Sequence, residues 1–112
     1  MKVLIHVDEE AKWAMALGNA ANLLAECARR HTPCALELVA NGGAVGALAQ
    51  GSPHAEALAA LLAQGAVAAA CANALRSSGL TPEQLLPGVT AVPAGVYELA
   101  EKQAQGYAYL KP

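Results

Sequence analysis

Charged side chains are scarce in this chain of 112 residues. Aspartate, glutamate, lysine and arginine make up 14% of the sequence, against about 25% in typical soluble domains, while 55% of the residues are hydrophobic. A small domain with so little charge leaves apolar surface exposed, and contiguous apolar patches usually mark interfaces between proteins. We therefore expect a homo-oligomer.

Basic residues are few and scattered along the sequence. The chain has seven lysines and arginines in all and a net charge of −2. Proteins that bind nucleic acid neutralise its phosphates with grouped basic side chains. The composition therefore argues against nucleic acid as a partner.

Segments that would direct the chain into or across a membrane are also missing. The beginning, MKVLIHVDEE, has too short an apolar run for a secretory signal, and no uncharged apolar stretch approaches the length of a membrane span. The three cysteines, Cys27, Cys34 and Cys71, show no C-x-x-C spacing, which argues against a disulfide framework or a metal site. We expect a cytoplasmic protein with reduced thiols, no membrane association, no metal and no cofactor.

What the sequence does contain is a regular alternation of apolar segments and amphipathic segments within a single domain, residues 1–112. Such alternation predicts an α/β fold of three layers, α/β/α, with a mainly parallel five-stranded sheet covered by helices on both faces. The strands are expected at residues 2–7, 35–40, 66–71, 89–92 and 107–110. The longer helices are expected at residues 11–30, 44–50, 54–64 and 96–105.

Cys71 ends the third expected strand, in the stretch AVAAACANALRSSG. Asn73 is expected to offer its side-chain oxygen to start a short helix, which ends at Gly79. Free backbone N–H groups and the positive end of the helix dipole favour a thiolate at such a junction, and Arg76 lies in the same segment. The position suits a reactive cysteine, although an unpaired cysteine often behaves as a small buried hydrophobe.

Further candidate residues follow from the parallel sheet, because ligands in this architecture gather at the carboxyl ends of the strands. The residues expected at that edge, besides Cys71 and Asn73, are His6, Asp8, Asn41, Gly42 and the turn from Pro93 to Gly95.

Some of these residues have a structural alternative. His6 is a candidate proton acceptor near the thiol, or else a hydrogen-bonded structural residue. The Asn41-Gly42 turn before a helix can bind an anion, but it lacks the G-x-G-x-x-G pattern and a P-loop lysine, so a plain tight turn is the alternative. Tyr107 and Tyr109 are interpreted as interface or core residues.

Six segments spread along the chain carry a resemblance to a known family: VLIHVDE at 3–9, VANG at 39–42, ACANALRSSG at 70–79, LLPGV at 85–89, VPAGV at 92–96 and KQAQGYAYLKP at 102–112. On these segments the chain resembles the DsrE/DsrF-like family of the sulfur-relay group. The resemblance implies a three-layer domain that assembles as a trimer or hexamer. It also implies that Cys71 carries sulfur as a persulfide and exchanges it with a donor or acceptor protein.

Two functions from different classes follow. The first is a sulfur carrier, or a sulfurtransferase-like protein, in which the Cys71 thiolate accepts sulfane sulfur and passes it on, with Asn73 and Arg76 expected to stabilise the persulfide. The second is a non-catalytic module that binds a small ligand in the crevice at the strand ends or serves in assembly. The reactivity of Cys71 distinguishes them.

Overall fold

The five strands form one sheet in which every neighbouring pair is parallel, in the order β4-β3-β2-β1-β5. The structure, a computed structural model, describes all of residues 1–112. The strands are β1 (Lys2–Val7), β2 (Ala35–Ala40), β3 (Val67–Cys71), β4 (Thr90–Val92) and β5 (Ala108–Leu110). This sheet confirms the predicted parallel α/β fold, and each strand lies within one residue of its predicted bounds.

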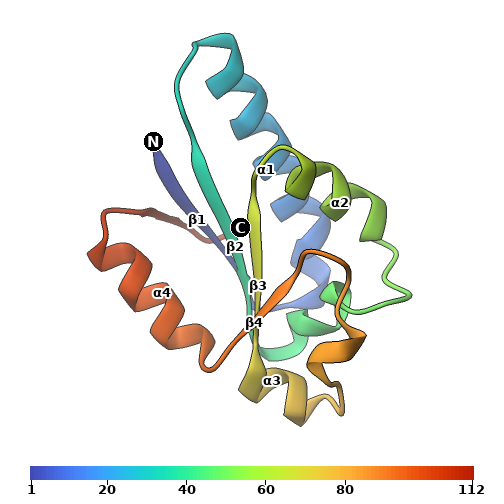
Figure 1. The fold of residues 1–112 in the computed structure, drawn as a ribbon. Coiled ribbons are helices and arrows are strands. Elements are labelled where there is room, and N and C mark those ends of the chain that lie inside the picture. The colour runs from blue at the N-terminus through green and yellow to red at the C-terminus, as the bar shows by residue number, and fades with distance from the viewer.

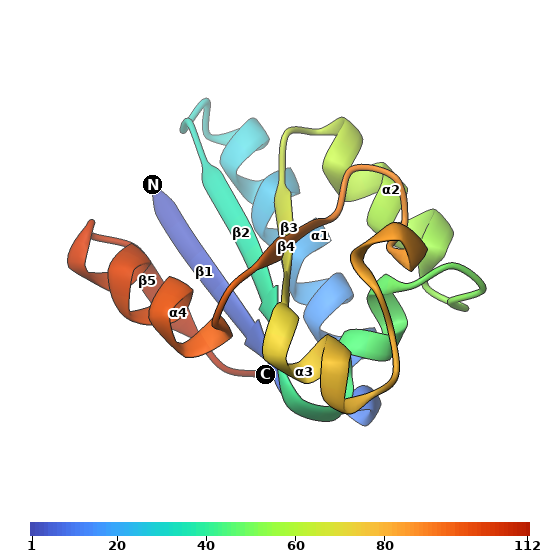
Figure 2. The same ribbon diagram turned by 60° about the horizontal axis from the view of Figure 1, so that its bottom comes forward.

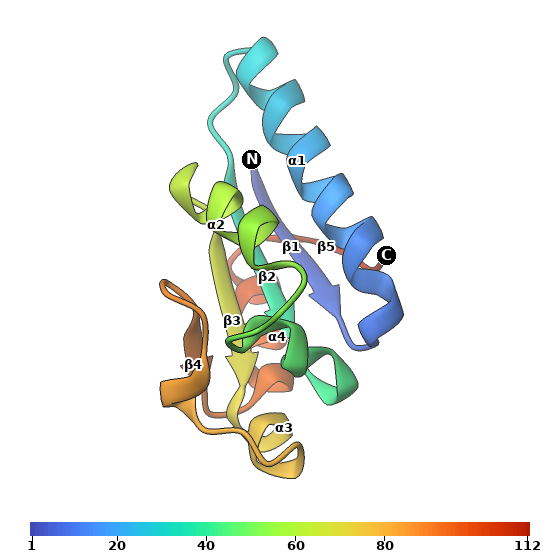
Figure 3. The same ribbon diagram turned by 90° about the vertical axis from the view of Figure 1, so that its right-hand side faces the viewer.

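Four α-helices connect and cover the strands: α1 (Trp13–Arg29), α2 (Ala55–Ala63), α3 (Ala72–Ser77) and α4 (Gly95–Ala104). Three short 3-10 helices complete the chain: η1 (Glu10–Lys12), η2 (Gly42–Leu48) and η3 (Pro82–Gln84). Helices α1 and α2 cover one face of the sheet and α4 covers the other, which gives the three layers (Figures 1 and 3). No helix combines the length and apolar character that crossing a membrane requires.

Over residues 44–50, where a helix is predicted, the structure has the 3-10 helix η2, which starts two residues earlier. Its sequence, GGAVGAL, contains three glycines, and glycine is the poorest α-helix former after proline. Short 3-10 turns are the usual form of such connectors.

The face under α1 and α2 holds the main hydrophobic core. Alternate residues of β1, β2 and β3 point to this face, and they join a cluster of 21 buried residues with side chains from α1, η2 and α2. Trp13 of α1 is fully buried in it, and its Nε1 donates a hydrogen bond to the Ala44 carbonyl oxygen at 2.8 Å. That bond satisfies the polar atom of the largest buried side chain.

The opposite face has a smaller apolar cluster and one buried charged residue. Leu99 of α4 packs with Leu4, Val39 and Ala69 of the three central strands. Glu37 of β2 lies beside this cluster and is the single buried charged residue in the chain. Helix α4 therefore rests on a face that is only partly hydrophobic.

Two side chains of α4 meet Glu37. Its Oε2 lies 3.7 Å from Lys102 Nζ, which in turn lies 3.9 Å from Glu98 Oε1. Burial, together with the hydrogen bond and the negative charge of Glu98, raises the pKa of Glu37 to about 7, although Lys102 opposes this. The two carboxyl groups and one ammonium group thus carry little net charge while Glu37 holds its proton.

Candidate functional site

Cys71 lies where β3 passes into α3, as predicted, and its residue is only 7% exposed. The prediction that Asn73 caps this helix is wrong. Cys71 itself keeps an extended backbone conformation and occupies the N-cap position, and α3 begins at Ala72. Asn73 lies in the first turn, where its Oδ1 accepts a hydrogen bond from Arg76 Nη2.

Backbone N–H groups of three residues lie close enough to the Cys71 sulfur to favour its thiolate by hydrogen bonding. Two come from the first turn of α3, at Asn73 and Ala74, and the third comes from Gly95 at the start of α4. The sulfur is therefore held between the N-terminal ends of two helices, which lie together at the carboxyl edge of the sheet (Figure 2). Unpaired N–H groups at helix N-termini stabilise negative charge.

The pKa of the Cys71 thiol results from two opposed effects. Burial alone would raise it, because an apolar environment disfavours the thiolate. The three backbone hydrogen bonds, with a smaller contribution from the charge of Arg76, lower it by more. The net pKa lies below the ordinary value for cysteine, so the site favours the nucleophilic form of the thiol.

Gly95 makes this arrangement possible by having no side chain. A Cβ at this position would lie 3.1 Å from Cys71 Cβ and 3.2 Å from Asn41 Cβ, closer than ordinary van der Waals contact. With glycine there, the start of α4 approaches the sulfur this closely without any shift of the neighbouring side chains. Three of the predicted edge residues, Asn41, Cys71 and Gly95, are thus brought together.

His6 lies on the same face of the sheet as Cys71, but its hydrogen bonds go to Asn41 and Tyr109. Its Nε2 is 2.8 Å from Asn41 Oδ1, and its Nδ1 is 2.6 Å from the Tyr109 hydroxyl. This role of Tyr109 was not predicted from the sequence; its ring also packs against His6 at a centroid distance of 5.7 Å. His6 therefore belongs to a hydrogen-bonded chain beside the thiol.

Asp8 and Gly42 form a separate part of the same edge. Asp8 Oδ1 pairs with Lys111 Nζ at 2.9 Å, and this hydrogen bond lowers the pKa of the Asp8 carboxyl group. Gly42 has φ +54°, and a Cβ there would lie 3.2 Å from the Asp8 carbonyl oxygen. No hydrogen bond or ion pair joins Asp8 to Cys71, so its direct participation in chemistry at the sulfur has no support in the geometry.

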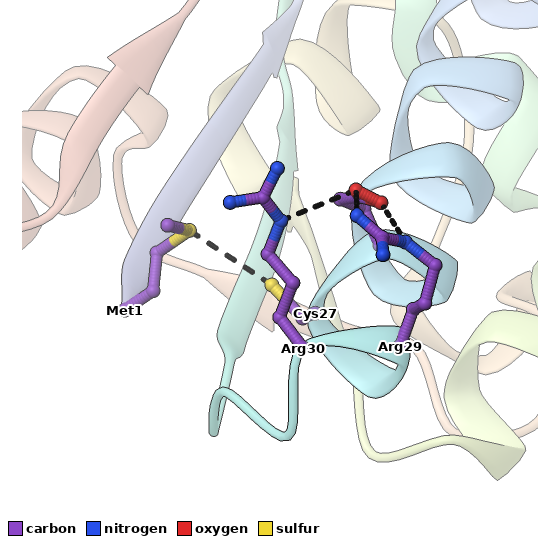
Figure 4. A network of polar contacts seen from close by, with 5 residues as sticks. Met1, Cys27, Arg29 and Arg30 are labelled. Atoms are coloured by element: carbon purple, nitrogen blue, oxygen red, sulfur yellow. Dashed lines mark hydrogen bonds and ion pairs between the residues drawn. The ribbon is translucent and has the colours of Figure 1, made fainter.

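The other two cysteines lie near the amino ends of β1 and β2, far along the strands from Cys71. Cys27 is buried in α1, with its Sγ 3.9 Å from Met1 Sδ, next to the pairing of Arg29 and Arg30 with Glu26 (Figure 4). Burial raises the pKa of the Cys34 thiol, and the neighbouring Cys27 raises it further. The pKa of the Cys34 thiol is therefore raised and that of the Cys71 thiol lowered, so Cys71 ionises more readily of the two.

A groove of about 440 Å³ lies between the end of β4 and α4, and Cys71 is not among the residues that line it. Val92, which pairs with Cys71 across the two strands, forms one end. The remaining lining residues come from the turn after β4 and from α4: Pro93, Ala94, Tyr97, Glu98 and Glu101. No three histidine, cysteine, aspartate or glutamate side chains are grouped as metal ligands would be.

Fold and site together define a parallel α/β domain with a buried cysteine of lowered pKa at the carboxyl edge of its sheet. Over residues 1–112 the chain matches the model of the DsrE/DsrF-like family, and it belongs to that family. The family is associated with sulfur relay in general. No curated protein matches the chain.

Solved structures of similar proteins agree with this fold. The protein MTH1491 of unknown function from Methanobacterium thermoautotrophicum is 33% identical, with 99% of this chain and 98% of that chain covered and a TM-score of 0.91. YchN from E. coli is 19% identical, with 100% and 99% covered and a TM-score of 0.78. BT1422 from Bacteroides thetaiotaomicron is 18% identical, with 99% and 94% covered and a TM-score of 0.77. The last two similarities concern the fold alone.

Proposed function

We propose that this protein is a sulfur carrier that holds sulfane sulfur as a persulfide on Cys71. The observation that supports this most is the set of three backbone N–H groups around a thiol whose pKa is lowered in spite of burial. Such a setting is typical of reactive cysteines rather than of cysteines that only fill space. Membership of a family associated with sulfur relay points to the same chemistry.

Loading is a nucleophilic substitution at sulfur. The Cys71 thiolate attacks the outer sulfur of a donor persulfide, R–S–SH, forming a new S–S bond while the S–S bond of the donor breaks. The donor leaves as the thiolate R–S⁻, which takes a proton from water, and Cys71 carries –S–SH. No net oxidation or reduction occurs, because a sulfane sulfur is exchanged between two thiols.

Delivery is the same step in the opposite direction. An acceptor thiolate attacks the outer sulfur, and Cys71 leaves as a thiolate. A thiol with a lowered pKa leaves faster, so the hydrogen bonds to the Cys71 sulfur support delivery as well as loading. In this scheme Asn73 contributes its backbone N–H, while Arg76 contributes charge and holds the Asn73 side chain.

The proposal includes the surroundings in which the carrier works. We expect it in the cytoplasm, where thiols stay reduced, exchanging sulfur with donor and acceptor proteins that reach the edge near the groove. We also expect a homo-oligomer, a trimer or hexamer, because several large apolar side chains are exposed: Val67, Val96, Tyr97, Tyr109 and Leu110. Light scattering in solution tests that assembly.

The central experiment challenges the protein with a sulfane-sulfur donor and locates the added sulfur by mass spectrometry of peptides. The wild type should gain one labile sulfur atom on Cys71. Cys71→Ser should gain none, whereas Cys27→Ser and Cys34→Ser, the matched controls, should load like the wild type. Arg76→Ala should load more slowly.

Two outcomes would reject the carrier function. One is uptake of a labile sulfur by folded Cys71→Ser, and the other is no uptake by the wild type from any donor tried. In either case the alternative, a non-catalytic module that binds a small ligand at the strand ends, would be favoured.

A further inference from the structure

We propose that Tyr109 and His6 position the Asn41 side chain so that its amide N–H₂ group holds the outer sulfur of a persulfide on Cys71. This inference rests on the proposed carrier function and adds a second hydrogen-bonding site to it. Asn41 is the residue that contacts the sulfur in this scheme, whereas His6 and Tyr109 act through Asn41 as positioning residues.

With a neutral His6 ring, the hydrogen bonds between these residues allow one assignment of donors. Asn41 Oδ1 can only accept, so His6 Nε2, 2.8 Å away, carries the hydrogen of the neutral ring. His6 Nδ1 must then accept a hydrogen bond from the Tyr109 hydroxyl at 2.6 Å. All donors and acceptors in this hydrogen-bonded chain are consistent with one tautomer of His6, and the Asn41 carbonyl oxygen accepts from His6.

The amide end of Asn41 remains available. No hydrogen bond within the chain uses its Nδ2, although the residue is half-buried. Asn41 directly follows β2, which lies next to β3, and its Cβ and the Cys71 sulfur lie 3.2 Å and 3.6 Å from the position of a Cβ on Gly95. The side chain that carries this unused pair of donors therefore starts close to the thiol, and we infer that its amide reaches the outer sulfur.

A persulfide needs donors at two places. The three backbone N–H groups serve the inner sulfur, but the outer sulfur lies about 2 Å further out and bears the negative charge once the persulfide is ionised. A hydrogen bond from the Asn41 amide to that atom stabilises the persulfide anion over its protonated form. It leaves the unloaded thiol, which has no outer sulfur, almost unaffected.

The test compares the two forms of the same protein. The rate of alkylation of Cys71 is measured against pH before and after loading with a sulfane-sulfur donor. In Asn41→Ala the apparent pKa of the persulfide should rise by about one unit, with an about tenfold lower alkylation rate below that pKa, as the loss of one hydrogen bond to a charged atom implies. The pKa of the unloaded thiol should stay as in the wild type.

Variants of His6 and Tyr109 separate positioning from a general structural role. His6→Leu should behave like Asn41→Ala, while His6→Gln, whose amide can still donate to Asn41 Oδ1, should restore most of the wild-type behaviour. Tyr109→Phe should show a smaller shift in the same direction. Asn22→Ala, the same chemical change at an exposed position of α1, is the control and should have no effect.

The outcomes distinguish this inference from the function on which it rests. If the wild type takes up no sulfur, both fail. A second outcome is that the wild type takes up sulfur while Asn41→Ala changes neither pKa, or changes the pKa of the thiol and that of the persulfide equally. In either case the carrier function stands and the role of Asn41 is rejected. Equal behaviour of His6→Leu and His6→Gln would likewise reject the positioning role.

Discussion

The sheet face covered by α1 and α2 and the face covered by α4 bury different kinds of side chain. The first face has a cluster of 21 buried apolar residues and no buried charged residue. The second has a cluster of four buried apolar residues, together with buried Glu37 and the side chains of Cys71, Asn41 and His6. The comparison indicates that one face supplies most of the apolar burial, while the other holds the buried charge and the proposed sulfur site.

The strand geometry explains how this separation arises. Successive residues of a strand point to opposite faces, and β1, β2 and β3 are in parallel register. One alternate set, including Ile5 and Leu38, therefore forms the core, and the other set carries the polar groups. We expect a mutation on the apolar face to change mainly the stability. A mutation on the α4 face should change mainly the pH dependence of stability or the pKa of the Cys71 thiol.

The largest effect is expected from a change on the apolar face. Trp13→Ala should lower the free energy of unfolding by about 3 to 5 kcal/mol, because it opens a large cavity and leaves the Ala44 carbonyl without its hydrogen bond. Urea denaturation followed by circular dichroism measures this. Met15→Ala, at a 55% exposed position of α1, is the control and should change stability by less than about 0.5 kcal/mol. A small loss in Trp13→Ala would contradict the division between the faces.

A smaller effect, on the α4 face, should depend on pH. In the folded protein the pKa of Glu37 is raised from 4.5 to about 7, so the folded state keeps this proton over a range in which the unfolded state has lost it. Stability from this group is complete below the unfolded pKa and is lost as the pH rises to about 7, by about 3 kcal/mol in total.

The variant Glu37→Gln tests this linkage. The free energy of unfolding of the wild type, minus that of Glu37→Gln, should fall as the pH rises from about 4 to 8. The same change at the exposed Glu83 should leave the pH dependence of the wild type unaltered. A difference between wild type and Glu37→Gln that stays constant across this range would show that Glu37 titrates normally.

The smallest effect should be local to the thiol. In Gly95→Ala the new Cβ would lie 3.1 Å from Cys71 Cβ, so the start of α4 must shift and weaken its hydrogen bond to the sulfur. We expect the pKa of the Cys71 thiol to rise by less than about one unit, measured by the pH dependence of alkylation. Gly46→Ala, where a Cβ meets nothing within 4 Å, is the control. If the reactivity of Cys71 is unchanged in Gly95→Ala, α4 does not contribute to stabilising the thiolate.

Much of the fold could be predicted from local sequence. The apolar strands and the glycines and prolines between them placed every strand within one residue, and the rule for parallel sheets brought Asn41, Cys71 and Gly95 to one edge. Short-range patterns were sufficient here because strand bounds depend on neighbouring residues.

The missed features depend on contacts between distant segments. The pairing of Tyr109 with His6 requires β5 to lie next to β1, which the alternation of strands and helices does not specify. The cluster of Glu37 with Lys102 depends on how α4 lies across the sheet. The start of α3 was misplaced because a side-chain cap at Asn73 was assumed, whereas the extended backbone of Cys71 makes it the N-cap.

The hydrogen bond between His6 and Tyr109 also has a consequence for folding. It joins residues 103 positions apart, and β1 cannot pair with β5 until nearly all of this sequence has been synthesised. Contacts of such long range close late and slowly, and until then one edge of β1 has free hydrogen-bonding groups that can pair with other chains. We therefore expect the nascent protein to be most prone to aggregation just before its last strand docks, the step that also completes the site.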